Sequence, residues 1–280
     1  MPKINWDGSQ LEMPFQRYRD TDAISQSQLK WLQKSPLHYW SKFIDPARIE
    51  VPLDTPALKF GTATHTAILE PDRFQSDYAL GPQATKSTKV WKEAVAATDK
   101  ILLTPDEYAA IQGMSVSLLQ HDAARKALFD NAGKNEQSYF FQLREDLFHN
   151  SGLKLKCRAD RILSNGIIVD LKTTADASAS AFSKSCANFG YHIQAAFYIK
   201  VVGLVTGVEP KGFAFVAVEK EPPYAVQVFK ASDAMIRYGM GKVNELLNDL
   251  RLLHEIPGEG PWPSYSAKAV ELDLPVWATR

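Results

Sequence analysis

Residues 156–174 read KCRADRILSNGIIVDLKTT, and they constrain the fold more than any other part of the chain. Two apolar, β-branched runs, 154–163 and 167–173, are separated by Ser-Asn-Gly, so we expect a β-hairpin. Alternation along the second run places Asp170 and Lys172 on one face of the strand. A strand this apolar is buried, and charged residues in a buried strand usually have a chemical role.

The length of the loop decides where Asp160, in the first run, lies relative to Asp170. A two-residue Asn-Gly loop would pair Asp160 with Leu171 and point the two carboxylates to opposite faces of the sheet. A three-residue Ser-Asn-Gly loop, with Gly166 in the left-handed region, pairs Asp160 with Asp170 instead. We predict the three-residue loop or an equivalent bulge. Two carboxylates on one face suit Mg²⁺ or Mn²⁺, which bind through carboxylate oxygens, water and substrate phosphate.

Lys172 adds a cation beside these carboxylates. It would orient or deprotonate an attacking water molecule, or stabilise the charge that develops on the reacting group. The alternative is an Asp-x-Lys ion pair on a solvated strand face, which is common and carries no chemistry. The apolar IIVDLK context favours the functional interpretation.

Four short motifs occur in order along the chain, and these are Phe60–His65, Ala159-Asp160, Asp170–Thr174 and Tyr191–Tyr198. Together they resemble the PD-(D/E)XK nucleases, and within that superfamily the nuclease domain of exonuclease VIII, the RecE-type phage recombination exonuclease. The resemblance runs from about Ser25 to Trp262-Pro263. The chain departs from the family pattern where Ala159 replaces a common proline and where Asp170 replaces a common glutamate; neither change removes a carboxylate.

The resemblance implies an α/β (α+β) fold, with a central mixed β-sheet flanked by helices and a restriction-endonuclease-like core. It implies a Mg²⁺-dependent exodeoxyribonuclease, with Mn²⁺ as a substitute metal, that digests double-stranded DNA from its ends in the 5′ to 3′ direction. The 3′ single-stranded overhangs would pass to a RecT-type single-strand annealing protein for recombination. Family members form rings, so the resemblance also implies a homo-oligomeric ring, a tetramer as in exonuclease VIII.

By the same resemblance, the metal ligands are His65, Asp160, Asp170 and the carbonyl oxygen of Leu171, and Lys172 is catalytic together with the two aspartates. We expect His65 on a helix over 59–69. A lone histidine on a helix with a core-facing side is otherwise usually a satisfied core residue, and Gly61 before it would let another backbone approach closely.

Gln194 and Tyr198 match the Gln-x-x-x-Tyr motif, which implies that they orient the active site and touch DNA near the scissile phosphate. Tyr191 lies on the same helical face, at i, i+3 and i+7 with these two residues. The alternative interpretation is an aromatic stripe that packs on the sheet. For Tyr191 the sequence favours neither interpretation over the other. Glu136 lies where relatives carry an acid, so we expect it to support the ligands rather than to bind metal itself.

We expect the DNA contacts to come from two hydroxyls at the end of a strand, one aromatic ring and two pairs of lysines. These residues are Thr173, Thr174, Tyr191, Lys30, Lys34, Lys86 and Lys89. The first two lysines lie on a helix that a Ser25–Gln28 capping box begins, and Ser35-Pro36 begins the next helix. The lysines of 85–92 are otherwise typical of a solvated loop and helix start.

The chain has 280 residues, 45% of them hydrophobic, enough to bury one full core. We expect a single nuclease domain over 1–280, with an extended N-terminal arm at 1–24, helices and the nuclease core at 25–253 and a C-terminal extension at 254–280. Two cysteines argue against a disulfide framework and fit a reducing cytoplasm, in a bacterial or phage-infected cell. Because no signal peptide or long apolar run is present, we expect no membrane association.

The formal net charge of +0 is unusual for a DNA enzyme, since lysine and arginine contacts to phosphate normally dominate affinity. Two other functions therefore stay open. One is a DNA-end-binding or scaffolding protein that keeps the nuclease fold without turnover, and the other is a RecB-type nuclease module that works with a helicase. The intact set of acids, histidine and lysine favours the enzyme over the scaffold.

Overall fold

The computed structural model describes residues 3–49, 55–130, 132–144, 152–256 and 260–274. In this part of the chain, one mixed sheet has the strand order β1-β4-β5-β6-β7-β8, and its members are β1 Ser9–Leu11, β4 Gly133–Gln142, β5 Lys154–Leu163, β6 Ile167–Thr174, β7 Gly212–Glu219 and β8 Val226–Lys230. Neighbouring strands are antiparallel except β6 and β7, which are parallel. The expected central mixed sheet is confirmed.

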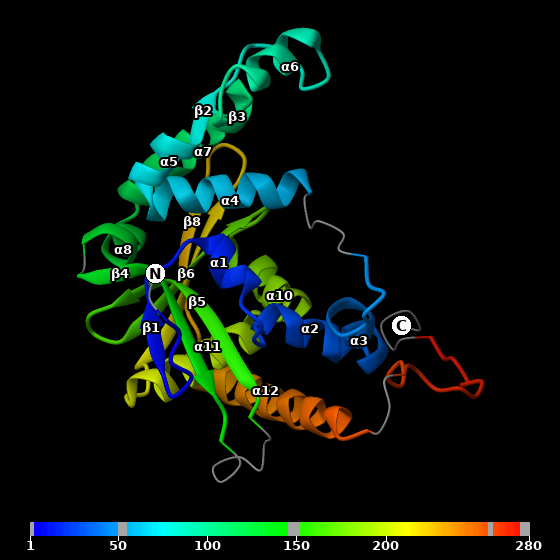
Figure 1. Ribbon diagram of the computed structural model, residues 1–280. Coiled ribbons are helices and arrows are strands. Elements are labelled where there is room, and N and C mark those ends of the chain that lie inside the picture. The colour runs from blue at the N-terminus through cyan, green and yellow to red at the C-terminus, as the bar shows by residue number, and fades with distance from the viewer. Residues whose placement is uncertain (1–2, 50–54, 131, 145–151, 257–259, 275–280) are drawn as a thin grey trace.

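Helices cover both faces of this sheet (Figure 1). The first group packs on the face that contains Ile168 and consists of α2 Gln26–Lys34, α3 Pro36–Phe43, α10 Ala179–Phe189, α11 Tyr191–Thr206 and α12 Asp233–His254. The second group packs on the face that contains Val169 and Leu171 and consists of α4 Pro56–Leu69, α5 Pro71–Asp77, α7 Pro105–Gln120, α8 Asp122–Arg125 and the π-helical turn Lys126–Asp130. Alternation along β6 thus divides its side chains between two apolar layers.

The hairpin between β5 and β6 has the three-residue loop that the sequence predicts. Arg161 pairs with Val169 and Ile162 with Ile168, and the Gly166 N–H donates to the Leu163 carbonyl oxygen at 2.9 Å. Gly166 has a φ of 85°, a conformation that glycine adopts without a steric cost. The paired residues end at Arg161 and Val169, the positions next to Asp160 and Asp170.

The N-terminal arm is docked, and the expectation of an extended arm is wrong. Residues 9–11 form β1, which pairs antiparallel with β4, and α1 spans Phe15–Asp20. Met13 and Tyr18 bury their side chains against Phe140 of β4. Apolar burial of this kind outweighs the entropy of a free segment.

One part of the chain projects from the body (Figure 1). It contains the two-stranded parallel sheet of β2 Tyr78–Leu80 and β3 Ile101–Leu103, together with α6 Lys89–Ala96. His121 interrupts the helical segment that follows β3, because it adopts an extended conformation and its side chain accepts from the Ala124 N–H at 3.2 Å. The α7 helix therefore ends there and α8 begins.

The C-terminal extension also lies on the body. The Trp262 ring stacks on Tyr39 of α3 at 5.8 Å, and the Leu37 N–H donates to the Pro263 carbonyl oxygen at 2.9 Å. Among the described residues, no helix combines the length and the apolar character that crossing a membrane requires.

Candidate active site

Three carboxylates lie in a row across neighbouring strands: Glu136 on β4, Asp160 on β5 and Asp170 on β6. The ladder between β4 and β5 continues on both sides of Glu136, with Asn135 opposite Arg161 and Gln137 opposite Ala159, so Glu136 faces Asp160. The ladder between β5 and β6 ends at Arg161 and Val169. Beyond this point the Leu171 N–H donates to Asp160 Oδ2 at 2.8 Å, so the carboxylate replaces the backbone carbonyl oxygen that would accept this bond in a regular ladder.

Asp170 is buried and held from two sides. Its Oδ1 accepts from Gln194 Nε2 of α11 at 2.7 Å, and its Oδ2 lies 2.5 Å from Lys172 Nζ. Lys172 Nζ also lies 4.8 Å from the centre of the Tyr191 ring, within the range of a cation–π contact. The predicted Asp-x-Lys pair is therefore an inward-facing pair with its own supports, and the solvated-face alternative does not hold.

His65 reaches the row from α4 on the other side of the sheet edge. Its Nδ1 lies 3.5 Å from Asp160 Oδ2. The predicted helix around it is confirmed. Gly61, one turn earlier, differs from expectation: a Cβ added there would meet no described atom within 4 Å, so no other described segment packs against it.

The charged groups perturb one another strongly. Burial, and after it the negative charge of Asp160, raises the pKa of Glu136 to about 7. Burial and the charge of Asp170 likewise raise the pKa of Asp160 to about 7. Burial and the positive charge of Lys172 lower the pKa of His65, which keeps the imidazole neutral at pH 7 and able to bind a metal.

Lys172 behaves in the opposite way. Burial by itself lowers the pKa of its ammonium group, but the carboxylates of Asp170 and Asp160 outweigh burial and raise the pKa overall. The side chain is therefore a cation at neutral pH. In this state it can stabilise negative charge or orient a water molecule, and it cannot accept a proton.

The donor set fits a divalent metal ion. One nitrogen of His65 and one carboxylate oxygen each of Glu136 and Asp160 lie within 4.8 Å of one another. Two half-buried acids with raised pKa values, Glu136 and Asp160, lack sufficient counter-charge, and a cation would relieve their repulsion. Asp170 Oδ2 is also buried and accepts no hydrogen bond of good geometry from the described residues. Carboxylate oxygens favour Mg²⁺ and Mn²⁺, and the imidazole is compatible with Mn²⁺.

The grouping differs from the predicted ligand set in one respect. Glu136, expected only to support the ligands, lies among the ligand atoms, whereas Asp170 is engaged by Lys172 and Gln194 and lies outside that group. Sequence patterns did not reveal Glu136 as a ligand because its position depends on the pairing of β4 with β5. Asp170 and the Leu171 carbonyl stay predicted ligands.

The other predicted site residues fall into two sets. Gln194, Tyr191 and Tyr198 lie near the row of carboxylates. Burial, and after it neighbouring groups that include Asp170 and Asp160, raises the pKa of the Tyr198 phenol. Thr173 and Thr174 end β6 on the same strand as Lys172, and the Thr174 hydroxyl donates to the Asp176 carbonyl oxygen at 3.1 Å.

The four lysines predicted to bind DNA are not equivalent. Lys30 on α2 lies 5.7 Å from the Phe189 ring, and burial together with the charge of Lys172 lowers its pKa, so it lies near the active site. Lys34 lies 5.8 Å from the Trp31 ring at the end of α2. Lys86 and Lys89 are on the projecting part, where Glu107 and Glu93 pair with them at 2.7 and 3.6 Å.

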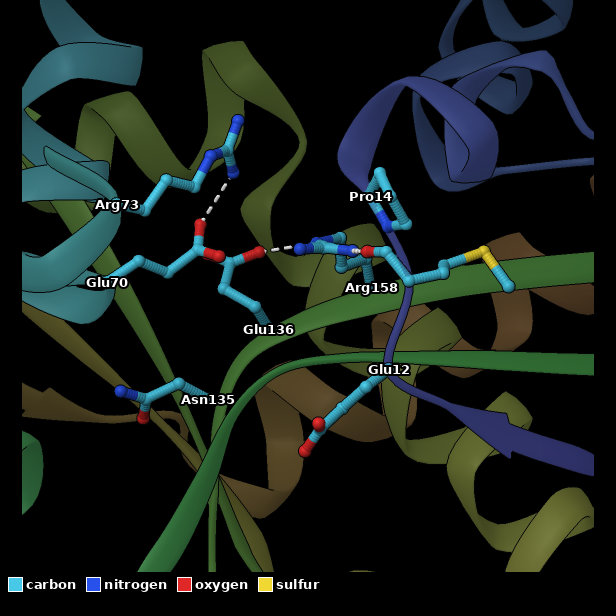
Figure 2. A pocket seen from close by; sticks show the side chains of 8 residues that line it. Glu12, Pro14, Glu70, Arg73, Asn135, Glu136 and Arg158 are labelled. Atoms are coloured by element: carbon cyan, nitrogen blue, oxygen red, sulfur yellow. Dashed lines mark hydrogen bonds and ion pairs between the residues drawn. The ribbon is translucent and has the colours of Figure 1, made fainter. Parts of the chain in front are cut away.

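A cavity of about 400 Å³ adjoins the row at Glu136 (Figure 2). Its wall comes from the N-terminal arm, α5 and the strands, and consists of Glu12, Met13, Pro14, Glu70, Arg73, Asn135, Glu136 and Arg158. Figure 2 shows Arg73 paired with Glu70 and Arg158 paired with Glu136. The cavity therefore connects the arm to the carboxylates.

Comparison with known proteins gives the same architecture. A family model described as "PDDEXK-like domain of unknown function (DUF3799)" matches residues 25–272. A solved structure described as a "Putative exonuclease" from Eubacterium rectale is similar with a TM-score of 0.58 and 16% identity, over 85% of this chain and 88% of that chain. The structure of SSO0001 matches 73% of this chain and 89% of that chain at 14% identity, with a TM-score of 0.32, which is too low to indicate a shared fold. No curated protein matches the chain.

Proposed function

The chain belongs to the family of PDDEXK-like domains, a branch of the PD-(D/E)XK nuclease superfamily, and from this premise we propose that it is a metal-dependent 5′-to-3′ exonuclease of double-stranded DNA. The single observation that supports the proposal most is the row of Glu136, Asp160 and Asp170 with Lys172 and His65 beside it. A fold kept only for binding has no physical reason to bury like charges together.

In the proposed reaction, His65, Glu136 and Asp160 would hold the metal ion, with Asp170 as a further ligand. A bound Mg²⁺ or Mn²⁺ supplies a Lewis acid for the scissile phosphate and lowers the pKa of a water molecule. Lys172 places its ammonium group where the attacking water and the phosphate meet, and it stabilises the charge that develops there. Gln194 fixes the orientation of Asp170 through Oδ1, so that Oδ2 faces Lys172.

DNA binding in this proposal uses groups around the row. The Tyr191 ring shields one side of Lys172, while Thr173 and Thr174 follow it on the strand and can donate to phosphate oxygens. Lys30 extends this surface on α2, and Tyr198 of α11 lies behind it with its ring packed against Phe213. The products would be mononucleotides and 3′ single-stranded overhangs, which an annealing protein of the RecT type would take up.

An end-labelled duplex tests the proposal. We expect digestion only when Mg²⁺ or Mn²⁺ is present, with early release of a 5′ label and late release of a 3′ label. Lys172→Ala should remove the activity and retain the fold, which circular dichroism can check. DNA binding without any metal-dependent digestion would support the scaffold function instead, and early release of the 3′ label would contradict the direction.

A further inference from the structure

Glu136 has a backbone conformation that is unusual for its residue type. Its φ is 51°, in the left-handed region, and among the described residues other than glycine only Tyr224 shares a positive φ. Glutamate has no local preference for this region, whereas Gly and Asn enter it readily. Conformations of this kind persist where the surrounding structure holds them, and they cluster at functional sites.

The unusual backbone coincides with a gap in the sheet. Asn135 and Gln137 pair with β5, but Glu136 between them makes no ladder pair with Asp160. Instead its carboxylate lies within 4.8 Å of the ligand atoms of His65 and Asp160. A regular strand would not bring these three groups to one point, so something must hold the Glu136 side chain there.

Arg158 is the contact that holds it. Its side chain is 7% exposed, and its Nε donates to Glu136 Oε2 at 2.5 Å. On the other side of the guanidinium, Nη1 donates to the Met13 carbonyl oxygen at 2.7 Å and to Ser138 Oγ at 3.3 Å. A guanidinium is a rigid fork, so fixing one edge aims the other edge. Figure 2 shows Arg158 paired with Glu136 and lying beside Pro14 of the arm.

The arm end of this chain is also fixed. Met13 follows β1, which pairs with β4, and its side chain is buried with Tyr18 against Phe140. The backbone around Met13 therefore has a definite position relative to the sheet. Glu12, Met13 and Pro14 form one wall of the cavity whose other wall includes Glu136 and Arg158.

We propose that Arg158 is a positioning residue, which uses the docked N-terminal arm as its anchor and holds the Glu136 carboxylate in the metal-binding cluster. The inference rests on the metal site of the proposed function. It adds that the affinity for metal depends on the contact of Arg158 with the Met13 carbonyl oxygen, although Met13 is not a ligand. A purely structural ion pair would affect stability and leave metal affinity unchanged.

Titration of the purified full chain with Mn²⁺, followed by calorimetry and by the electron paramagnetic resonance signal of free Mn²⁺, separates these two roles. We expect Arg158→Met to weaken Mn²⁺ binding by about 10-fold to 100-fold, the usual effect of removing a group that orients a metal ligand. Arg158→Lys should weaken it less, because one ammonium group can reach either Glu136 or the arm but cannot reproduce the fork.

Lys156→Met is the matched control. Lys156 is a buried cation on the same strand, and its Nζ donates to the carbonyl oxygens of Tyr18, Arg19 and Thr21, so it contacts the arm and no carboxylate of the row. We expect this variant to lower the melting temperature and to bind Mn²⁺ within about twofold of the wild type, since the metal ligands keep their supports.

Three outcomes would overturn the inference: wild-type Mn²⁺ affinity in folded Arg158→Met, equal weakening in Lys156→Met, or no Mn²⁺ binding by the wild type. If Arg158→Met does not fold, wild-type affinity in Arg158→Lys overturns it in the same way. A parallel digestion assay keeps the two proposals apart. A wild-type protein that binds Mn²⁺ through Arg158-dependent positioning but digests no DNA would end the proposed function and leave this inference standing.

Discussion

At the scale of single residues, Asp170 and Lys172 are expected to have the largest effect on activity. Asp170→Asn removes charge from the row and Lys172→Ala removes the cation that stabilises the reaction, so each should lower turnover by at least about two orders of magnitude. Steady-state digestion with saturating Mg²⁺ measures this. Lys242→Ala, which breaks an exposed pair with Glu245 on α12, is a matched control and should digest DNA at the wild-type rate. Full activity in Lys172→Ala would refute the assignment.

The two acids with raised pKa values make a prediction about stability. Asp160 and Glu136 titrate at about 7 in the folded protein, compared with 3.8 and 4.5 as ordinary values. Between these limits the folded state holds more protons than the unfolded state, so the free energy of unfolding of the metal-free protein should fall as the pH rises from about 5 to about 7.5. The slope should be at most about 1.4 kcal/mol per pH unit for each group.

Denaturant unfolding in EDTA at several pH values measures this effect, and Glu136→Gln should flatten the slope. His65 has the opposite sign below its ordinary pKa, because its pKa is lowered in the folded state. Because two carboxylates oppose one histidine, the free energy of unfolding should still fall as the pH rises. Mn²⁺ should raise the melting temperature more at pH 7.5 than at pH 5.5. Stability that rises with pH equally in the wild type and in Glu136→Gln would contradict the prediction.

At the scale of elements, α4 carries a glycine that packing against the described residues does not explain. Gly61 lies one turn before His65, and a Cβ there would meet no described atom within 4 Å. Gly61→Ala should therefore stabilise the protein by about 0.5–1 kcal/mol. Because we expect DNA to occupy this space, the same change should slow digestion by about 10-fold, the effect of roughly 1.4 kcal/mol lost in binding.

Gly241→Ala on α12 is the control for Gly61→Ala, since a Cβ at Gly241 also meets no described atom within 4 Å. Both variants should melt at a higher temperature than the wild type. Only Gly61→Ala should lose activity. Equal activity in the two variants would show that the surface of α4 above His65 does not face the substrate.

The α2 helix and the projecting part should differ in their use of lysine. Lys30 lies close enough to Lys172 for the two charges to interact, whereas Lys89 pairs with Glu93 on α6. Lys30→Ala should weaken DNA binding and reduce the slope of log affinity against log salt by about one phosphate contact. Lys89→Ala should change both quantities less. Fluorescence anisotropy with a labelled duplex at several salt concentrations compares the two variants. A larger effect from Lys89→Ala would indicate that the DNA contacts the projecting part and not α2.

At the scale of the whole molecule, a chain with a net charge of +0 should hold DNA weakly at physiological salt. Long digestion without release then needs enclosure, because a closed ring keeps the substrate bound by topology rather than by affinity. We expect a homo-oligomeric ring, with four subunits as the resemblance implies, that digests a duplex in one encounter after excess competitor DNA is added. Light scattering measures the mass. A monomer that stops after a few nucleotides under competitor would contradict the ring and leave the chemistry intact.

Sequence patterns were sufficient for the local features. The Ser-Asn-Gly loop set the register of β5 against β6, so the pairing of Arg161 with Val169, next to Asp160 and Asp170, was predictable within one hairpin. Capping signals likewise placed the helix starts, and the Ser25 N–H does donate to Gln28 Oε1 at 3.1 Å. The physical reason is that loop geometry and capping act over a few neighbouring residues.

Only the tertiary structure determined the remainder of the site. Glu136 joins His65 and Asp160 because β4 pairs with β5 and because its own backbone takes a positive φ, which no local preference of glutamate predicts. Arg158 has a role because a distant segment of the arm docks beside it. The sequence by itself determined the Asp-x-Lys strand and its hairpin, since both follow from side-chain periodicity and turn chemistry. Contacts between segments distant in the sequence, such as His65 with Asp160 and Met13 with Arg158, decided the ligand geometry, since long-range pairing and burial select them and adjacent residues do not.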